Sequence, residues 1–278
     1  MRRFPLPLVP FLAATLLHVG ALRGGFHFDD EHAVVRNPAV QDLRSVPLFF
    51  TDPARFSASG EGAMYRPVTL ALHAVNAAQA RTSSPLPWLA TNLLLHASCA
   101  AGLFLLAREV LRRTGCDRPE VPSLAASLLF AVHPLATEVV NYVSARSSSL
   151  AFAFAIGALL AHLRAREGSR LAGAGALLLG ALAMFSRETA VALPLLVATV
   201  ELLLPGSARA RLLRTLPSLA VAAAFLALRA HLLGGVVGPT AAVPDVEPEA
   251  GWGRSPETNF VLQTLAAVRF LGLVLWPA

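Results

Sequence analysis

The sequence contains no lysine, and only 14% of its 278 residues are charged, against roughly a quarter in ordinary soluble proteins. Hydrophobic residues make up 55%. This composition excludes a typical soluble enzyme and predicts an integral membrane protein that contacts the lipid bilayer. The net charge of +6 does not indicate a nucleic-acid partner, because about half of the 23 basic residues, all arginines, lie in short segments between apolar runs.

Cysteine is also scarce. Cys99 lies in an apolar run and Cys116 in a short polar segment, so we expect no disulfide between them. A Gly-rich phosphate loop is missing, which excludes the common nucleotide-binding motifs, and the sequence shows no repeat of solenoid period. The chemistry of this protein is therefore expected to proceed without a bound nucleotide.

Apolar stretches close to the roughly 20 residues that cross a bilayer occur about eight times. The predicted fold class is all-α, a polytopic transmembrane helix bundle, because a backbone in lipid must satisfy its own hydrogen bonds. The first stretch follows Met1-Arg2-Arg3 and could alternatively be a cleaved signal peptide. We expect Pro134 to kink the third. The stretches are Pro5–Leu22, Leu86–Ala107, Val121–Val143, Ser147–Leu163, Leu171–Phe185, Thr189–Leu204, Thr215–Leu233 and Phe260–Trp276.

The arginines predict the orientation of the spans. They gather at the N-terminus and in alternate loops, which the positive-inside rule places in the cytoplasm. The N-terminus is therefore predicted to be cytoplasmic, and the other loops to lie on the outer, periplasmic or extracellular side. The arginines in question are Arg2, Arg3, Arg108, Arg112, Arg113, Arg118, Arg164, Arg166, Arg170, Arg209, Arg211 and Arg214.

The first outer loop, residues 24–85, is long enough to hold structure of its own. Within it, Tyr65 to Ala80 has polar and apolar residues on different faces of a helical repeat, which predicts an amphipathic helix in the membrane interface that roofs the bundle. The whole chain, residues 1–278, is expected to form a single transmembrane domain. Because Trp276-Pro277-Ala278 lacks a basic flank, we expect the sequence to be the front part of a longer protein.

Three consecutive acids follow the first span, Asp29, Asp30 and Glu31, directly after Phe26-His27-Phe28. Carboxylates at bilayer depth are strongly disfavoured, so these acids are expected at the watery edge of the membrane. Two adjacent carboxylates can divide the work of a general base and an orienting partner. We take Asp29 and Asp30 as candidate catalytic residues, and as the ligands of a divalent metal if one binds. The alternative is a solvated loop.

Two further polar clusters fall on the predicted outer side. The first comprises His133, Glu138 and Arg146, at the end of the third span. The second is Arg187-Glu188, between two apolar stretches, with Tyr65 and Arg66 in the first outer loop. The arginine fork matches phosphate oxygens, so these residues are candidate substrate-binding groups. The alternatives are a Glu138 ion pair with Arg146 or Arg187, and an arginine that merely snorkels to the interface.

Other polar and small residues are expected to be structural. Asn92 and His96 lie one turn apart and are expected to form hydrogen bonds between helices. Gly173, Gly175 and Gly180 are interpreted as close-packing positions, and Glu201 as an interfacial residue at the cytoplasmic end of its span.

Taken together, these residues resemble integral-membrane glycosyltransferases of the C-type fold, and most of all the transmembrane O-mannosyltransferase family with C-terminal tetratricopeptide repeats and its bacterial relatives. The similar phrases run in the same order as in that family. They are Phe28-Asp29-Asp30 with Asn37-Pro38, Tyr65-Arg66-Pro67-Val68-Thr69 with Asn76, Asn92 with Leu95-His96, His133-Pro134 with Thr137-Glu138 and Arg146, Arg187-Glu188, and Leu275-Trp276-Pro277.

The resemblance implies transfer of a sugar, mannose or a similar hexose, from a polyprenyl-phosphate carrier to a protein hydroxyl at the outer face. It further implies that Asp29 accepts the proton, that Asp30 orients the acceptor or the sugar, and that Arg187 binds the lipid phosphate. Two features depart from the family pattern. Where the family commonly reads Arg-x-Asp, this chain has Arg146-Ser147-Ser148, and the repeats are missing.

Two other functions compete with the transferase. A transporter or flippase for lipid-linked sugars would place polar residues near mid-membrane and break spans in matching halves, whereas most ionisable residues here fall at the outer rim. An inactive scaffold is the third alternative. No cofactor other than the metal is predicted.

Overall fold

The structure is a computed structural model that describes residues 5–58, 64–80, 84–235 and 256–276. Within these ranges every regular element is helical and none is a strand, which confirms the all-α prediction. The chain divides into two compact units, Met1–Pro239 and Thr240–Ala278. The second contributes one helix, α10 (Pro256–Leu275). The single domain over 1–278 stays a prediction.

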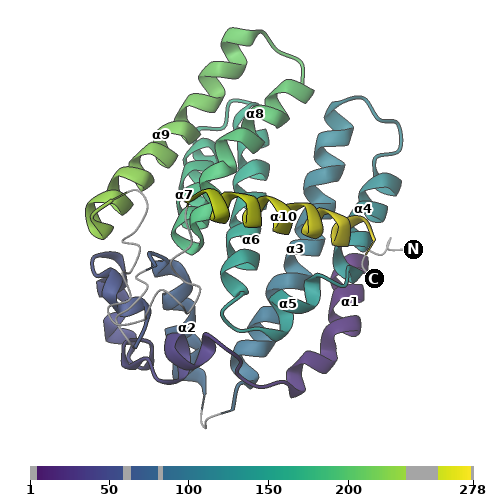
Figure 1. Cartoon of the computed structure of the whole chain (residues 1–278). Coiled ribbons are helices and arrows are strands. Elements are labelled where there is room, and N and C mark those ends of the chain that lie inside the picture. The colour runs from purple at the N-terminus through teal and green to yellow at the C-terminus, as the bar shows by residue number, and fades with distance from the viewer. Residues whose placement is uncertain (1–4, 59–63, 81–83, 236–255, 277–278) are drawn as a thin grey trace. The chain divides into compact units, whose positions relative to one another are not determined.

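The first unit holds nine α-helices among its described residues, joined by short 3₁₀ and π segments (Figure 1). The α-helices are α1 (Leu8–His18), α2 (Pro67–Gln79), α3 (Leu86–Arg113), α4 (Glu120–Val132), α5 (Ala136–Asn141), α6 (Arg146–Ala165), α7 (Arg170–Ser186), α8 (Leu193–Leu203) and α9 (Ala208–Leu233). The shorter segments are η1 (Val19–Arg23), η2 (Glu31–Val35), η3 (Pro38–Gln41), η4 (Leu43–Phe50), η5 (Pro53–Phe56) and η6 (Glu188–Ala192).

Helix α3 packs against α1, α4 and α6, and α6 passes the packing on to α7. Helices α8 and α9 pack on each other, with α9 against α7 and α8 against α6. The largest apolar cluster lies among these later helices and includes Leu159, Met184, Val197 and Phe225. Burial of such side chains contributes roughly 25 cal/mol per Å² of apolar surface that is removed from water on folding.

The unit has two chemically different ends. We call the end formed by the turns 114–119, 166–169 and 204–207 the arginine-rich end; its turns are tied together by hydrogen bonds from Arg113 to Glu167 (2.5 Å) and from Arg166 to the Pro205 carbonyl (2.9 Å). We call the opposite end, formed by residues 24–58, 64–80, 133–148 and 187–192, the motif end. In Figure 1 the α8–α9 turn lies at the top and α2 toward the bottom. The described turns alternate between the two ends, and which side of a membrane each end faces stays a prediction.

Three described helices, α3, α6 and α9, are long and apolar enough to cross a bilayer. The apolar helices over Leu8–Arg23, Glu120–Val132, Arg170–Ser186 and Phe260–Leu275 are shorter. A membrane-spanning character is therefore supported for three segments, and the count of about eight spans stays a prediction.

The third predicted span is not one kinked helix. Helix α4 ends at Val132, His133 is extended (φ −64°, ψ 130°), and α5 begins at Ala136. Pro134 explains the break, because it lacks an N–H donor and forces the preceding residue out of the helical region. The prediction of a kink over Val121–Val143 was wrong, since two separate helices result.

The helix expected over Tyr65–Ala80 is present as α2, and its buried side includes polar residues. Thr69, His73 and Asn76 are buried, whereas Val75 is exposed. The Thr69 hydroxyl donates to the Ser186 carbonyl at 2.8 Å. Leu70 and Ala74 are buried as well, in an apolar cluster with the first loop, so both hydrogen bonds and apolar contacts hold α2 at the motif end.

Glu201 is enclosed by protein, with 1% of its surface exposed, and its place at the membrane interface stays a prediction. The prediction about the glycines needs correction. Of the three glycines, Gly180 is closely packed, since a Cβ there would lie 3.0 Å from Leu193 Cδ2, whereas Gly173 and Gly175 have room around them. Cys99 and Cys116 are both free thiols, as expected.

Candidate functional site

The candidate site is organised around residues 142–148, which join α5 to α6. Asp30 binds this segment from the first loop: its Oδ1 accepts hydrogen bonds from the Ser144 amide (2.7 Å) and hydroxyl (2.6 Å). Its Oδ2 accepts from the amides of Val143 (3.3 Å) and His27 (2.9 Å). The side chain is fully buried. Both oxygens are thus satisfied by protein donors, and Asp30 fixes the loop to the bundle.

Asp29 differs from its neighbour because it faces solvent, with 65% of its side chain exposed. Its Oδ1 lies 3.5 Å from His32 Nε2, and its amide donates to the Tyr142 hydroxyl at 3.3 Å. Phe28 before it has a positive φ of 47°, which is strained for a bulky side chain. The buried Asp30 and the strained Phe28 therefore hold a carboxylate in the open.

Arg146 is fully buried at the start of α6. Its Nε donates to Asn92 Oδ1 (3.0 Å), its Nη1 to Asn76 Oδ1 (2.5 Å) and its Nη2 to the Trp88 carbonyl (2.8 Å). These partners come from α2 and α3, so the guanidinium joins three helices through neutral acceptors. Asn92 also donates to the Tyr142 carbonyl at 3.1 Å, and His96 bonds the Ala131 carbonyl, which confirms their predicted role between helices.

His73 of α2 is buried near this guanidinium. Burial, and next the positive charge of Arg146, lower the pKa of His73 well below 6.5. The imidazole is therefore neutral at physiological pH, which avoids a second buried positive charge beside Arg146.

Arg187 approaches the same segment from the opposite side. It is extended between α7 and η6, and its Nη1 donates to the hydroxyls of Ser147 (3.1 Å) and Ser148 (2.8 Å). Among the described residues no carboxylate lies within ion-pair distance of it. Both of these partners are neutral hydroxyls, which do not compensate the charge of Arg187.

The half-buried Arg187 lies at an apolar groove of about 200 Å³ between α6 and the η6–α8 segment. Burial, and next the positive charge of Arg66, lower the pKa of Arg187, while Glu188 and Glu138 act in the opposite direction. A cation beside an apolar groove suits an anion with a lipid tail. The lining residues are Ser148, Ala151, Phe152, Ala155, Arg187, Thr189, Ala190, Ala192, Leu193 and Leu196.

Arg66 and Glu188 form a two-pronged ion pair, with Nε to Oε2 at 2.9 Å and Nη2 to Oε1 at 2.6 Å. Burial alone would raise the pKa of Glu188, but the hydrogen bonds and charge of Arg66 outweigh it and lower the pKa to about 2. Arg66 is thus engaged with Glu188 rather than free for a phosphate.

Tyr65 is a core residue in this structure. Its hydroxyl donates to the Phe50 carbonyl (2.9 Å), its ring packs on Phe185 and Phe225, and burial raises its pKa. It anchors the start of α2 to the later helices.

Glu138 is exposed on α5, and His133 is half-buried at the α4–α5 break, where its Nδ1 accepts from the Leu135 amide at 3.3 Å. Neither Arg146 nor Arg187 forms an ion pair with Glu138 within the described part of the chain. The alternative of a packed ion pair between Glu138 and Arg146 or Arg187 is therefore wrong.

The fit of a metal to Asp29 and Asp30 is poor. Both Asp30 oxygens already accept hydrogen bonds, and no group of three or more His, Cys, Asp or Glu side chains in the described ranges could hold a metal ion. We derive no step through a metal.

The sequence patterns missed the serines. Ser144 binds Asp30, and Ser147 and Ser148 bind Arg187, so the run from Ser144 to Ser148 links the two candidate clusters. The departure from Arg-x-Asp at residues 146–148 was the available signal. It could have been interpreted as serines in contact with a charged residue at this place.

These features define a helical, membrane-type protein with an exposed carboxylate and an unneutralised arginine at one end. The chain is 30% identical to the mouse protein O-mannosyl-transferase TMTC4 over 219 residues, which cover 72% of this chain and 29% of that protein. It is 30% identical to Tmtc1 of Drosophila melanogaster, covering 69% and 22%, and 29% identical to F38B6.6 of Caenorhabditis elegans, covering 58% and 22%. Both are also named protein O-mannosyl-transferases.

The resemblance to the transmembrane O-mannosyltransferase family is thereby confirmed. The chain spans less than a third of the length of these curated relatives. No protein-family profile matches it, and no solved structure matches it.

Proposed function

We propose that this chain forms the sugar-transfer site of a C-type-fold glycosyltransferase, which moves mannose or a similar hexose from a polyprenyl-phosphate carrier to a hydroxyl of a protein acceptor. The reaction takes place on the outer side of the membrane, in a polytopic bundle of about eight spans whose N-terminus is cytoplasmic. The observation that carries the proposal is Arg187, a half-buried cation held by two neutral hydroxyls at an apolar groove.

The carrier fits this arrangement by its chemistry. Its phosphate pairs with Arg187, since the guanidinium fork matches phosphate oxygens, and its first isoprene units lie in the groove beside Phe152 and Leu196. The rest of the tail stays in the bilayer. Glu138 and His133 border the sugar, while Arg66, Glu188 and Tyr65 hold α2 over the site.

Asp29 acts as the general base. It takes the proton of the acceptor hydroxyl while the acceptor oxygen forms a bond to the anomeric carbon. The bond between that carbon and the phosphate oxygen breaks, and its electron pair leaves with the phosphate, whose charge Arg187 stabilises. Asp30 and Arg146 are positioning residues, because their contacts are with the protein.

Transfer of radiolabelled mannose from polyprenyl-phosphate mannose to an acceptor protein, with the chain in lipid vesicles, tests the base. We expect Asp29→Asn to lower kcat by roughly 10²- to 10⁴-fold, the usual contribution of a general base. Glu31→Gln is the matched control, since Glu31 is a neighbouring exposed acid paired with Arg36. Equal rates for Asp29→Asn and the parent would refute this role.

Arg187→Gln tests the phosphate site in the same assay. Loss of a charge-assisted hydrogen bond to the carrier should raise its KM by about tenfold or more. Arg36→Gln, which removes an exposed arginine of the motif end, should leave KM unchanged. A KM for Arg187→Gln that matches the parent would remove the carrier from this groove.

The break between α4 and α5 favours a second candidate, a transporter of lipid-linked sugars, because discontinuous helices are common in transporters. Vesicles loaded on one side with labelled carrier distinguish the two. A transporter moves the lipid across the membrane and forms no new glycosidic bond.

A further inference from the structure

A cavity of about 370 Å³ lies at the arginine-rich end, between α6, α7, α8 and α9. Its walls are mostly apolar, with Leu177, Leu193 and Val197 among them, and small residues such as Gly173 and Ala176 leave the space open. The volume is within the roughly 300–1,000 Å³ typical of ligand pockets. Its ionisable lining side chains are all basic: His162, Arg166 and Arg214.

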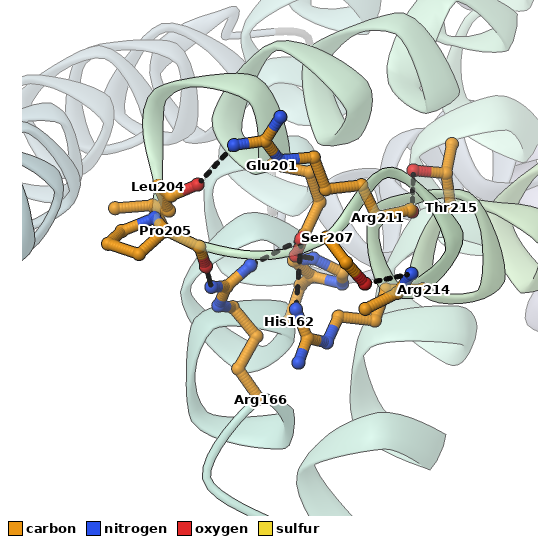
Figure 2. A network of polar contacts seen from close by, with 10 residues as sticks. His162, Arg166, Glu201, Leu204, Pro205, Ser207, Arg211, Arg214 and Thr215 are labelled. Carbon is orange, nitrogen blue, oxygen red and sulfur yellow. Dashed lines mark hydrogen bonds and ion pairs between the residues drawn. The ribbon is translucent and has the colours of Figure 1, made fainter.

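These basic groups meet at one buried carboxylate, Glu201 (Figure 2). Oε1 of Glu201 lies 2.9 Å from His162 Nε2, while Oε2 accepts hydrogen bonds from Arg166 and, at 3.3 Å, from Arg214. One carboxylate thus faces two guanidinium groups. The cluster keeps a net positive charge even when His162 is neutral, and its burial limits screening by salt.

Most of this uncompensated positive charge lies on Arg214. Arg166 makes a second hydrogen bond, to the Pro205 carbonyl. Arg214, by contrast, makes only the long bond to Glu201 among the described residues, and 37% of its side chain is exposed. Its remaining donors are therefore free for an anion, and a guanidinium prefers one that accepts two hydrogen bonds, such as a phosphate.

We propose that this cavity binds the headgroup phosphate of an anionic membrane lipid, with part of an acyl chain along Leu177, Leu193 and Val197. A free inorganic anion would gain nothing from these apolar walls, whereas a lipid satisfies both the cation and the walls. The arginine-rich end is also the predicted cytoplasmic side, where anionic lipids are abundant. Of the side chains that line the Arg187 groove, Leu193 also lines this cavity, whereas none of the charged groups is shared.

The test uses the full chain purified in neutral detergent. Unfolding temperature is measured during titration with phosphatidylglycerol, phosphatidylcholine or inorganic phosphate. We expect phosphatidylglycerol to raise it most. The lipid concentration for half of that shift should increase at least about tenfold in Arg214→Gln, through loss of a charged hydrogen bond, and similarly in Ala176→Phe, whose ring fills the cavity.

Arg209→Gln is the matched control, because Arg209 is an exposed arginine five residues before Arg214 on α9 and does not line the cavity. It should titrate like the parent. Equal shifts with the two phospholipids, or an equal loss in Arg209→Gln, would overturn the proposal. So would inorganic phosphate that reproduces the whole shift, with Ala176→Phe unaffected, since this would mean a free-anion site.

Discussion

The motif end and the arginine-rich end each bury one carboxylate, but they surround it with different partners. Asp30 accepts hydrogen bonds from neutral amides and a hydroxyl, whereas Glu201 is bound by Arg166, Arg214 and His162. At the motif end the buried cation, Arg146, likewise has neutral acceptors. The fully buried charges of the motif end are thus bound by neutral groups, whereas the buried carboxylate of the arginine-rich end is bound by basic groups.

This difference teaches how the same residue types serve different purposes. Because neutral groups bind Asp30, Arg146 and Arg187, none of these charges is compensated by a direct ion pair, which is what the role proposed for Arg187 requires. Where a single carboxylate gathers the basic groups, it holds α6, α8 and α9 together and leaves only the excess positive charge. Substituting one charged residue at a time tests whether the two ends differ in this way.

The largest effect is expected for Arg146→Ala. It would leave the Asn76, Asn92 and Trp88 acceptors unsatisfied in the interior, at a cost of at least about 3 kcal/mol of unfolding free energy. Thermal or denaturant unfolding in detergent measures the loss. Arg164→Ala, an exposed arginine on the same helix, should change stability little. If both variants unfold alike, the neutral-acceptor network does not stabilise the motif end.

A smaller loss is expected for Asp30→Asn. The amide nitrogen would face N–H or O–H donors where an oxygen accepted before, which should cost roughly 2 kcal/mol. Asp29→Asn serves as the control, because its side chain is exposed and its removal should leave the unfolding free energy unchanged. A larger loss of unfolding free energy in Asp29→Asn than in Asp30→Asn would contradict the structural role of Asp30.

The smallest effect concerns the Arg66–Glu188 pair. The pKa of Glu188 is lowered from 4.5 to about 2, so its contribution is fully present above about pH 4.5 and is lost as pH falls toward 2. Because 37% of the Glu188 side chain is exposed, solvent screening reduces this to about 1 kcal/mol. Unfolding followed from pH 5 to pH 2 should show a shallower acid loss in Glu188→Gln than in Glu31→Gln.

Several elements were predictable because the signal is local. Apolar stretches indicated the helices, since burial in lipid or in a bundle requires them, and Pro134 indicated a disturbance in the third stretch. The extent of that disturbance was not local. Whether a proline kinks or separates a helix depends on what holds the next segment, and here Asn92 and Asp30 bind the residues after α5.

The polar face of α2 shows the same limit. Its spacing predicted two faces but not which one is buried. Thr69 and Asn76 face the bundle because Ser186 and Arg146 offer partners there, and Leu70 and Ala74 are buried in an apolar cluster with the first loop.

The sequence by itself determined the helical class, the gathering of arginines in particular turns, and the resemblance to the O-mannosyltransferases, because composition and spacing act over short distances. It could not separate Asp29 from Asp30, or show that Glu201 is buried. Only the tertiary structure decided these, because the environment of a charge depends on donors from distant segments, such as Ser144 for Asp30 and Arg166 for Glu201.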